Sequence, residues 1–398
     1  MNRLGFEIKK GDIKLIEKIF SSKFLVSLLL FPFFKSEAFN CIPCLAEITN
    51  VILAIECLML FFINICSKNK SKFFIMMILF SFWNYIISPL LGGHTSESIY
   101  YLLESLGMIS FIDIALKVNY KKSISGISSI FTFMVILNFL TLVLFPNGLI
   151  PMSKNGNVYL FGLRTGFSLV IIPSFLFNFI DDNINNNDKF SLKTVICLIL
   201  GLYSLISEWV VTGIIEVFIT LILYILFVLR KDKKLNKYIR IIFISIMIIN
   251  FSMTLIGDSF SIVSFIANLL NKDITLSGRT YIWECAVNKL NQNPLLGYGL
   301  ESTVNIYGIL KPAHNHWLHI GLMSGYIGMI ILIISFYFSC LKLKSQSMSK
   351  NNNLICVFII SILIGCITEI QLYFPFIYMI FELPYLLEYI DESDEVDQ

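Results

Sequence analysis

Apolar runs of about 20 residues recur along this chain and are separated by short polar stretches. A run of that length is what an α-helix needs to cross the hydrocarbon core of a membrane. The composition agrees, because 56% of the 398 residues are hydrophobic and 14% are charged, against about 25% charged in a soluble globular chain. The pattern predicts an all-α polytopic membrane protein.

The apolar runs predict about 12 transmembrane helices within a single integral membrane domain, residues 1–398. One long outer-face loop, 258–316, is expected to contain short helices. The predicted spans are 15–34, 45–66, 73–92, 99–117, 127–146, 164–181, 192–207, 210–229, 240–257, 317–341, 353–369 and 372–389.

The distribution of basic residues predicts the orientation, since cytoplasmic loops carry an excess of lysine and arginine. If the N-terminus lies in the cytoplasm, nearly all the lysines and arginines of the short loops lie on the cytoplasmic side. The opposite loops around 35–44, 93–98 and 147–163 carry only Lys35 and Lys154. Both termini are therefore predicted to be cytoplasmic, and the outer face receives 147–163 and the extracytoplasmic loop 258–316.

Two arginines are expected on the outer side of the membrane. Arg164 stands where a span begins, and Arg279 precedes a segment that looks like a helix start. Arg164 is either an interfacial residue that reaches the lipid headgroups or part of an anion clamp, since a guanidinium fork suits phosphate oxygens. A cation is unfavourable at a helix N-terminus, so the alternative for Arg279 is an ion pair with Glu284.

Three histidines, His314, His316 and His319, lie where the outer loop ends and the next span begins. His316 and His319 have the spacing of one helical face, but there is no H-E-x-x-H motif and the loop acids show no metal-ligand spacing. We predict no metal site and no cofactor. A histidine that acts as general base is favoured, because its ordinary pKa lies close to working pH.

Acidic residues also lie within or at the ends of the predicted spans, namely Glu56, Glu104, Glu208 and Glu216. Such residues are functional candidates by default. A proton pathway and a structural hydrogen-bond network are both open for them.

Five sequence elements in order resemble the signature of the O-antigen ligase and Wzy-type polysaccharide polymerase superfamily. They are Gly278-Arg279, Trp283, Asn293-Pro294-Leu-Leu-Gly297-Tyr-Gly299, Ala313-His314-Asn315-His-Trp317-Leu318 and Gly325-Tyr-Ile-Gly328. The resemblance covers about 50 residues, 277–328. One departure is Ser207-Glu208, where many members of that superfamily have Ser-Arg.

The resemblance implies a metal-independent membrane glycosyltransferase that uses an undecaprenyl-diphosphate-linked glycan as donor. His314 matches the essential histidine of the superfamily, Arg279 the loop arginine and, more loosely, Arg164 the arginine before the mid-chain span. The catalytic residues predicted are these three. The substrate-binding residues predicted are Asn315, His316, Trp317, Tyr281 and Trp283.

The function predicted is an O-antigen or capsule polymerase in a bacterial plasma membrane. Its expected partners are a lipid-linked oligosaccharide, membrane lipids and a chain-length regulator, with no nucleic acid. The alternatives are an O-antigen ligase that uses a lipid A core and, from another class, a flippase or transporter of lipid-linked sugars. A transporter should spread charged residues over many spans, whereas here polar residues gather in one outer loop. A sensor or scaffold protein remains a background alternative.

Overall fold

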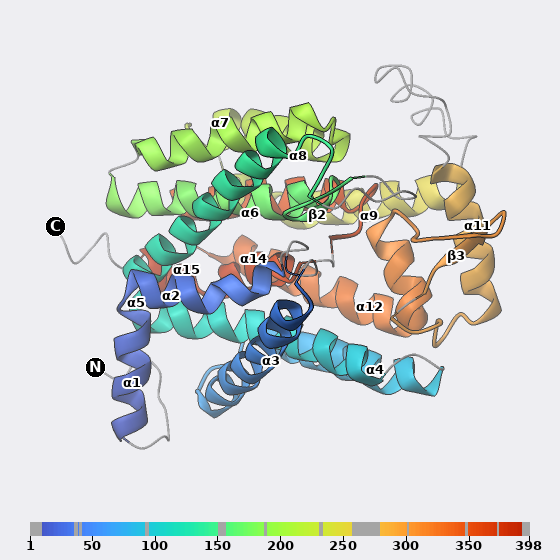
Figure 1. The fold of residues 1–398 in the computed structure, drawn as a ribbon, viewed down its shortest axis with the longest axis horizontal. Helices are drawn as coiled ribbons and strands as arrows, with labels where there is room; N and C mark the ends of the chain where they lie inside the picture. The colour runs from blue at the N-terminus through green and yellow to red at the C-terminus, as the bar shows by residue number, and fades with distance from the viewer. Residues whose placement is uncertain are drawn as a thin grey trace.

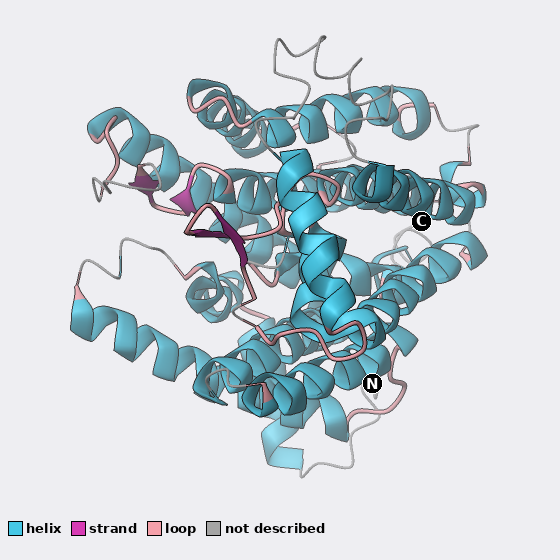
Figure 2. Cartoon of the chain, turned by 90° about the vertical axis from the view of Figure 1, so that its right-hand side faces the viewer, coloured by secondary structure: helices cyan, strands magenta, loops and turns pink. Residues whose placement is uncertain are grey.

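The computed structural model describes residues 10–35, 39, 42–91, 95–149, 157–186, 189–230, 234–256, 279–300, 302–346, 349–371 and 374–391. These residues form an almost entirely helical protein (Figure 1), and the strands are confined to two short hairpins (Figure 2). Gly278, Glu301 and the part of the predicted outer loop before Arg279 lie outside the described residues.

The helices fall into two groups along the chain. Those before residue 230 are α1 (Lys10–Phe20), α2 (Lys23–Leu30), α3 (Pro43–Cys66), α4 (Lys72–Leu90), α5 (Thr95–Leu144), α6 (Gly166–Asn185), α7 (Leu192–Ser207) and α8 (Val211–Leu223). Those after it are α9 (Ile239–Ile256), α11 (Arg279–Gln292), α12 (His316–Ser345), α13 (Lys350–Gly365), α14 (Phe376–Glu382) and α15 (Leu387–Asp391). The strands are β1 (Val158–Tyr159), β2 (Gly162–Leu163), β3 (Val304–Ile306) and β4 (Ile309–Lys311).

Six helical segments of the described chain are long and apolar enough to cross a membrane. They are Cys44–Cys66, Lys72–Leu90, Ser98–Leu144, Gly166–Asn185, Val211–Val228 and His316–Ser345. Large apolar side chains stand exposed on α3, for instance Val51, Met59 and Phe62, as lipid contact would allow and water would not. The structure thus supports an all-α multi-pass membrane protein.

The number of twelve spans is not confirmed. The predicted spans 99–117 and 127–146 fall in α5, which consists of two helices that meet at a kink at Asn119 (φ −154°, ψ 85°). Leu192–Ser207, Lys350–Gly365 and Phe376–Tyr385 are apolar but shorter than the membrane-crossing segments. α5 packs against α3, α4, α6 and α7 (Figure 1) and forms the centre of the first half of the fold.

The Asn293–Gly299 loop docks onto a bend in α12. At Gly325 (φ 66°, ψ −176°) α12 leaves helical geometry. The loop backbone fills this bend, since Tyr298 N donates to Leu322 O (2.7 Å) and Tyr326 N donates to Pro294 O (2.7 Å). A Cβ on Gly297 would lie 2.6 Å from Leu322 O, and one on Gly325 would collide with Leu295 O. Both glycines are required by close backbone contact.

A second, smaller core forms at the end of the molecule where α11 and β3 lie together (Figure 1). Trp283 of α11 is fully buried in it. The other members come from α9, α11, the β3–β4 hairpin and the start of α12; they are Met253, Ile282, Ala286, Leu290, Val304, Ile306, Ala313, Leu318 and Leu322. This core fixes α11 and the segment before α12 relative to each other.

The β3–β4 hairpin turns at Tyr307 and Gly308, both with positive φ (50° and 84°). Glycine adopts this backbone freely, but it costs another residue about 1–2 kcal/mol. The Tyr307 ring stacks on Tyr281 of α11, with centroids 5.8 Å apart and planes at 13°. An aromatic pair contributes about 0.5–1.5 kcal/mol, so strain and stacking roughly cancel and the fold gains little from this tyrosine.

We predict that Gly325→Ala destabilises the protein much more than Gly308→Ala. The first change forces a glycine-only backbone, which costs about 1–3 kcal/mol, and adds a clash with the Leu295 carbonyl that costs about 1–3 kcal/mol more. A Cβ on Gly308 would meet no atom within 4 Å, so its variant carries only the backbone strain. Thermal unfolding of the purified proteins in detergent measures both; equal losses would contradict the docking of the loop on α12.

Candidate active site

The turn after α13, residues 366–371, holds the chain segment that precedes α12. The Asn315 side chain donates from Nδ2 to Ile367 O (2.8 Å), and its Oδ1 accepts from Leu318 N (2.9 Å) as the N-cap of α12. His316 N donates to Cys366 O (2.9 Å), and Gln371 N donates to His316 Nδ1 (3.2 Å). The position of His314 therefore depends on this turn.

Arg279, the first residue of α11, is anchored to the same turn. Its Nη1 donates to Thr368 O and its Nη2 to Glu369 Oε1 (2.5 Å). Glu369 thereby compensates a cation at a helix N-terminus, where the helix dipole disfavours it. The alternative pairing of Arg279 with Glu284 is not what the structure shows.

Glu369 also faces His314. Its Oε2 lies 3.8 Å from His314 Nδ1, an ion-pair distance rather than a hydrogen bond. α13 ends at Gly365, so Glu369 belongs to the turn beyond the helix. Burial raises the pKa of the Glu369 carboxyl, but His314 and Arg279 outweigh burial and hold that pKa below its ordinary value. Glu369 is an anion shared by two candidate catalytic residues.

Arg164 reaches the site from the β1–β2 hairpin. Its exposed guanidinium donates from Nη1 to the carbonyl of Glu208 at 3.5 Å. The Glu208 carboxylate accepts from the hydroxyl of Tyr159 (2.8 Å) on β1. Glu208 is the position at which the sequence departs from the superfamily pattern. Through these two contacts it connects the hairpin that carries Arg164 to the end of α7.

Arg164 and Arg279 line one cavity of about 260 Å³, near the lower end of small-molecule sites. The cavity lies where α8, α9 and the turn after α13 meet, and Glu369 borders it. The other lining residues are mainly apolar: Thr165, Trp209, Val210, Val211, Thr212, Ile215, Glu216, Ile249, Met253, Ile364, Gly365, Ile367 and Thr368. Arg279 keeps three of its five donors after its two contacts, so both guanidinium groups can bind an anion here.

The five predicted substrate-binding residues are not equally accessible. Asn315, His316, Trp317 and Trp283 are all fully buried, whereas Tyr281 is 43% exposed. Trp317 and Trp283 pack in the two hydrophobic cores. None of these four side chains is exposed in this structure, and their burial favours a packing role over direct contact with a substrate. Among the three histidines, His314 has a side chain that is 30% exposed.

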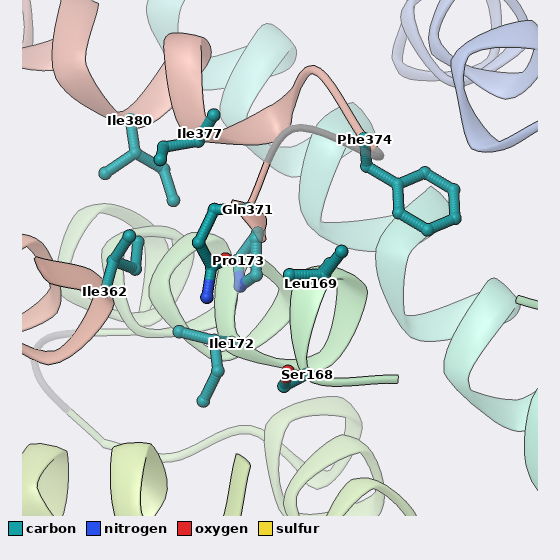
Figure 3. A pocket seen from close by; sticks show the side chains of 9 residues that line it. All are labelled: Ser168, Leu169, Ile172, Pro173, Ile362, Gln371, Phe374, Ile377 and Ile380. Carbon is teal, nitrogen blue, oxygen red and sulfur yellow. The ribbon is translucent and has the colours of Figure 1, made fainter. Parts of the chain in front are cut away.

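The predicted intramembrane acids have different surroundings. The Glu216 Oε1 accepts from Gln371 Nε2 (3.0 Å), and a Cβ on Gly365 would collide with it. Figure 3 shows Gln371 entering a small space lined mostly by apolar side chains of α6, α13 and α14, among them Ile172 and Ile362. Glu104 forms an ion pair with Lys35. For Glu216 and Glu104 these contacts favour a structural network over a proton pathway.

Sequence reasoning missed Glu369. The residue lies at the end of the predicted span 353–369 and belongs to the same class of acids as Glu216, so its place at a span end was a usable signal. Nothing in the pattern linked it to Arg279, 90 residues away. Among the residues that the structure describes, no three His, Cys, Asp or Glu side chains gather as metal ligands would.

Residues 194–333 match the family model for O-antigen ligase, a Wzy_C domain. The match spans 140 of the 398 residues and includes Arg279 and His314. It confirms the resemblance to the O-antigen ligase and Wzy superfamily, whose members are membrane glycosyltransferase-like enzymes. Arg164 and Glu369 lie outside the matched residues. No curated protein matches the chain.

We predict that Glu369→Gln lowers stability by about 1–3 kcal/mol, because it leaves the charge of the partly buried Arg279 without its counter-ion. The matched control is Glu388→Gln, which removes the exposed partner of Lys342 (2.9 Å) and should cost about 0–1 kcal/mol. Thermal unfolding in detergent at pH 7 compares the two variants. A loss at Glu369 no larger than at Glu388 would contradict a central role of this carboxylate.

The stability difference between wild type and Glu369→Gln should depend on pH in one direction. Because the pKa of Glu369 is lower in the folded state, its contribution is present above the unfolded-state pKa of about 4.3 and disappears as the pH falls through the folded-state value. The difference should be constant from about pH 8 to pH 5 and shrink below about pH 4. A difference that grew on acidification would have the wrong sign.

Proposed function

We propose that this protein is a polysaccharide polymerase that transfers an undecaprenyl-diphosphate-linked glycan onto a hydroxyl group of another lipid-linked repeat unit. The observation that carries the proposal is the convergence of two arginines on one cavity, with Glu369 connecting Arg279 to His314. The Wzy_C match supports the family of reactions.

The reaction needs little covalent participation by the protein. The acceptor oxygen attacks the anomeric carbon of the donor, the new glycosidic bond forms, and the bond from that carbon to the phosphate oxygen breaks. Undecaprenyl diphosphate leaves with the bonding electrons. Arg164 and Arg279 would stabilise the negative charge that develops on the diphosphate, as preorganised donors do in a site shielded from water.

His314 would take the proton of the attacking hydroxyl group. With Nδ1 directed at the Glu369 carboxylate, the neutral imidazole leaves Nε2 as the proton acceptor, and the carboxylate stabilises the imidazolium that results. Glu369 itself is a poor base, because its pKa is lowered and Arg279 occupies one of its oxygens.

The cellular setting follows from the predicted topology. We place the protein in a bacterial plasma membrane with both termini in the cytoplasm and the site on the outer face, where the arginine-lined cavity meets lipid-linked donors. The proposed reaction is metal-independent and uses no cofactor. A chain-length regulator is a candidate protein partner.

The second candidate function is an O-antigen ligase, which the description of the matching family favours. A ligase would transfer the same donor to a lipid A core instead of to a second repeat unit. The polymerase and the ligase would use the same donor-binding part of the site, so only the identity of the acceptor distinguishes the two reactions.

We predict that the purified protein converts a synthetic undecaprenyl-diphosphate repeat unit into a ladder of products on a gel, and that His314→Ala abolishes the ladder and leaves single units. Loss of the general base should reduce the rate by about 10²–10⁴-fold. His319→Ala, in the first turns of α12, is the matched histidine control. Activity that survives EDTA would support the metal-independent reaction.

The other outcomes of this assay separate the alternatives. Transfer that occurs only when a lipid A core is supplied would establish the ligase. Movement of the lipid-linked unit across a liposome bilayer without covalent change would establish a transporter and refute both enzyme functions.

We predict that Arg279→Lys is severely impaired, although it keeps the positive charge. Lysine cannot hold Thr368 O, Glu369 Oε1 and a phosphate oxygen with one planar fork. The matched control is Arg240→Lys, beside a predicted cytoplasmic loop, which should retain full activity. Initial rates of the ladder reaction measure both variants, and full activity of Arg279→Lys would remove the clamp assignment.

A further inference from the structure

Two tyrosines form an exposed aromatic surface beside the candidate active site. Tyr281 on α11 and Tyr307 at the tip of the β3–β4 hairpin stack with their planes at 13°. Their surroundings leave them 43% and 88% exposed. Residues 26 positions apart in the sequence thus form one stacked pair, in which the Tyr307 ring is the more exposed.

Packing in the protein core does not explain why a tyrosine occupies position 307. Ile306 enters the core beside it, whereas Tyr307 lies outside that core and has a positive φ that suits glycine. The turn is already secured by Asn305, whose Oδ1 accepts from Gly308 N (2.8 Å). A large aromatic side chain that adds strain at an exposed tip points to a function that needs the ring.

The polar surroundings of the pair suit a sugar. On α11, Glu284 and Asn288 follow Tyr281 at i+3 and i+7 and share its exposed face. The electron-rich face of an aromatic ring attracts the C–H groups on one side of a pyranose, while carboxylate and amide groups bond its hydroxyls. We propose that Tyr281 and Tyr307 form a saccharide-binding platform, with Glu284 and Asn288 at its polar edge.

The position of the platform indicates which part of the glycan it binds. Tyr281 is two residues after Arg279, a rise of about 3 Å along the helix axis, but residues at this spacing project to opposite sides of a helix. The platform therefore cannot hold the sugar whose anomeric carbon reacts at the diphosphate. It would bind sugars further along the oligosaccharide, after the chain passes the start of α11. This assignment rests on the proposed function.

A membrane surface is the rival occupant, because tyrosine rings also lie among lipid headgroups. The exposed carboxylate of Glu284 on the same helix face disfavours that alternative, since a charged side chain is costly to bring into a membrane. We therefore propose a sugar, and not a membrane surface, as the ligand of the platform.

The test measures binding of the source strain's own surface polysaccharide, released from its lipid by mild acid, to the full-length protein in detergent. Tyr307→Gly is the informative variant, because glycine suits the turn and removes the ring without endangering the fold. We expect its dissociation constant to rise at least about tenfold, as when an aromatic ring that stacks on a nucleic-acid base is removed. The dissociation constant of Tyr307→Phe should stay within about twofold, because phenylalanine keeps the ring. Leu310→Ala, 67% exposed on the same hairpin, is the control and should bind normally.

Unchanged binding by Tyr307→Gly, or an equal loss in Leu310→Ala, would overturn the platform; the second result would indicate a general apolar surface for lipid. In the ladder assay, Tyr307→Gly should start chains normally and yield shorter products, and products of wild-type length would overturn it as well. Binding needs no donor and should persist in His314→Ala. A wild-type protein that binds glycan but makes no ladder would refute the proposed function and leave the binding site standing.

Discussion

The arrangement of the candidate site depends on one buried carboxylate. Glu369 accepts from Arg279 with one oxygen and faces His314 with the other. A buried carboxylate is costly unless it is paired, and here the cation that begins α11 and the imidazole that precedes α12 both lie against it. The same turn binds Asn315 and His316 through its backbone. One short turn after α13 therefore sets the position of two helix starts and of the candidate base between them.

The polar contacts of Arg279 with this turn would not by themselves hold α11 in place, because Arg279 is only the first residue of the helix. The rest of α11 is fixed by the smaller core around Trp283 and by the loop that follows the helix. That loop enters the bend of α12 at Gly325, where its backbone bonds Leu322 and Tyr326. Gly297 and Gly325 of the sequence signature thus lie away from the candidate catalytic residues but still affect them. They permit the backbone contact that orients α11, and α11 places Arg279 against Glu369.

Much of this could be predicted from the sequence, and the reasons for the failures are physical. Apolar runs of membrane length identify helices because lipid requires them, and the break between the runs 99–117 and 127–146 coincides with the kink at Asn119, but the runs do not establish how many helices cross the membrane. Ordered motifs pointed to Arg279 and His314. Glu369 was not predicted because its importance depends on a contact with Arg279, which is 90 residues away in the sequence. Trp283 and Tyr281 look equally suited to bind sugar in the sequence, yet two residues on a helix face opposite ways, and only the fold decides that Trp283 is buried and Tyr281 is not.

Glu369 also separates the two halves of the proposed reaction. Arg164 and Arg279 line the cavity on one side of it, whereas His314, which is not among the residues lining that cavity, approaches its other oxygen. A donor diphosphate carries negative charge and would be repelled by an acid that stood alone. Arg279 neutralises this acid from the cavity side, so the diphosphate meets a guanidinium while the imidazole still meets a carboxylate. A single anion with two different partners can thus orient the base without weakening the anion site, and this accounts for the place of the acid between the guanidinium and the imidazole.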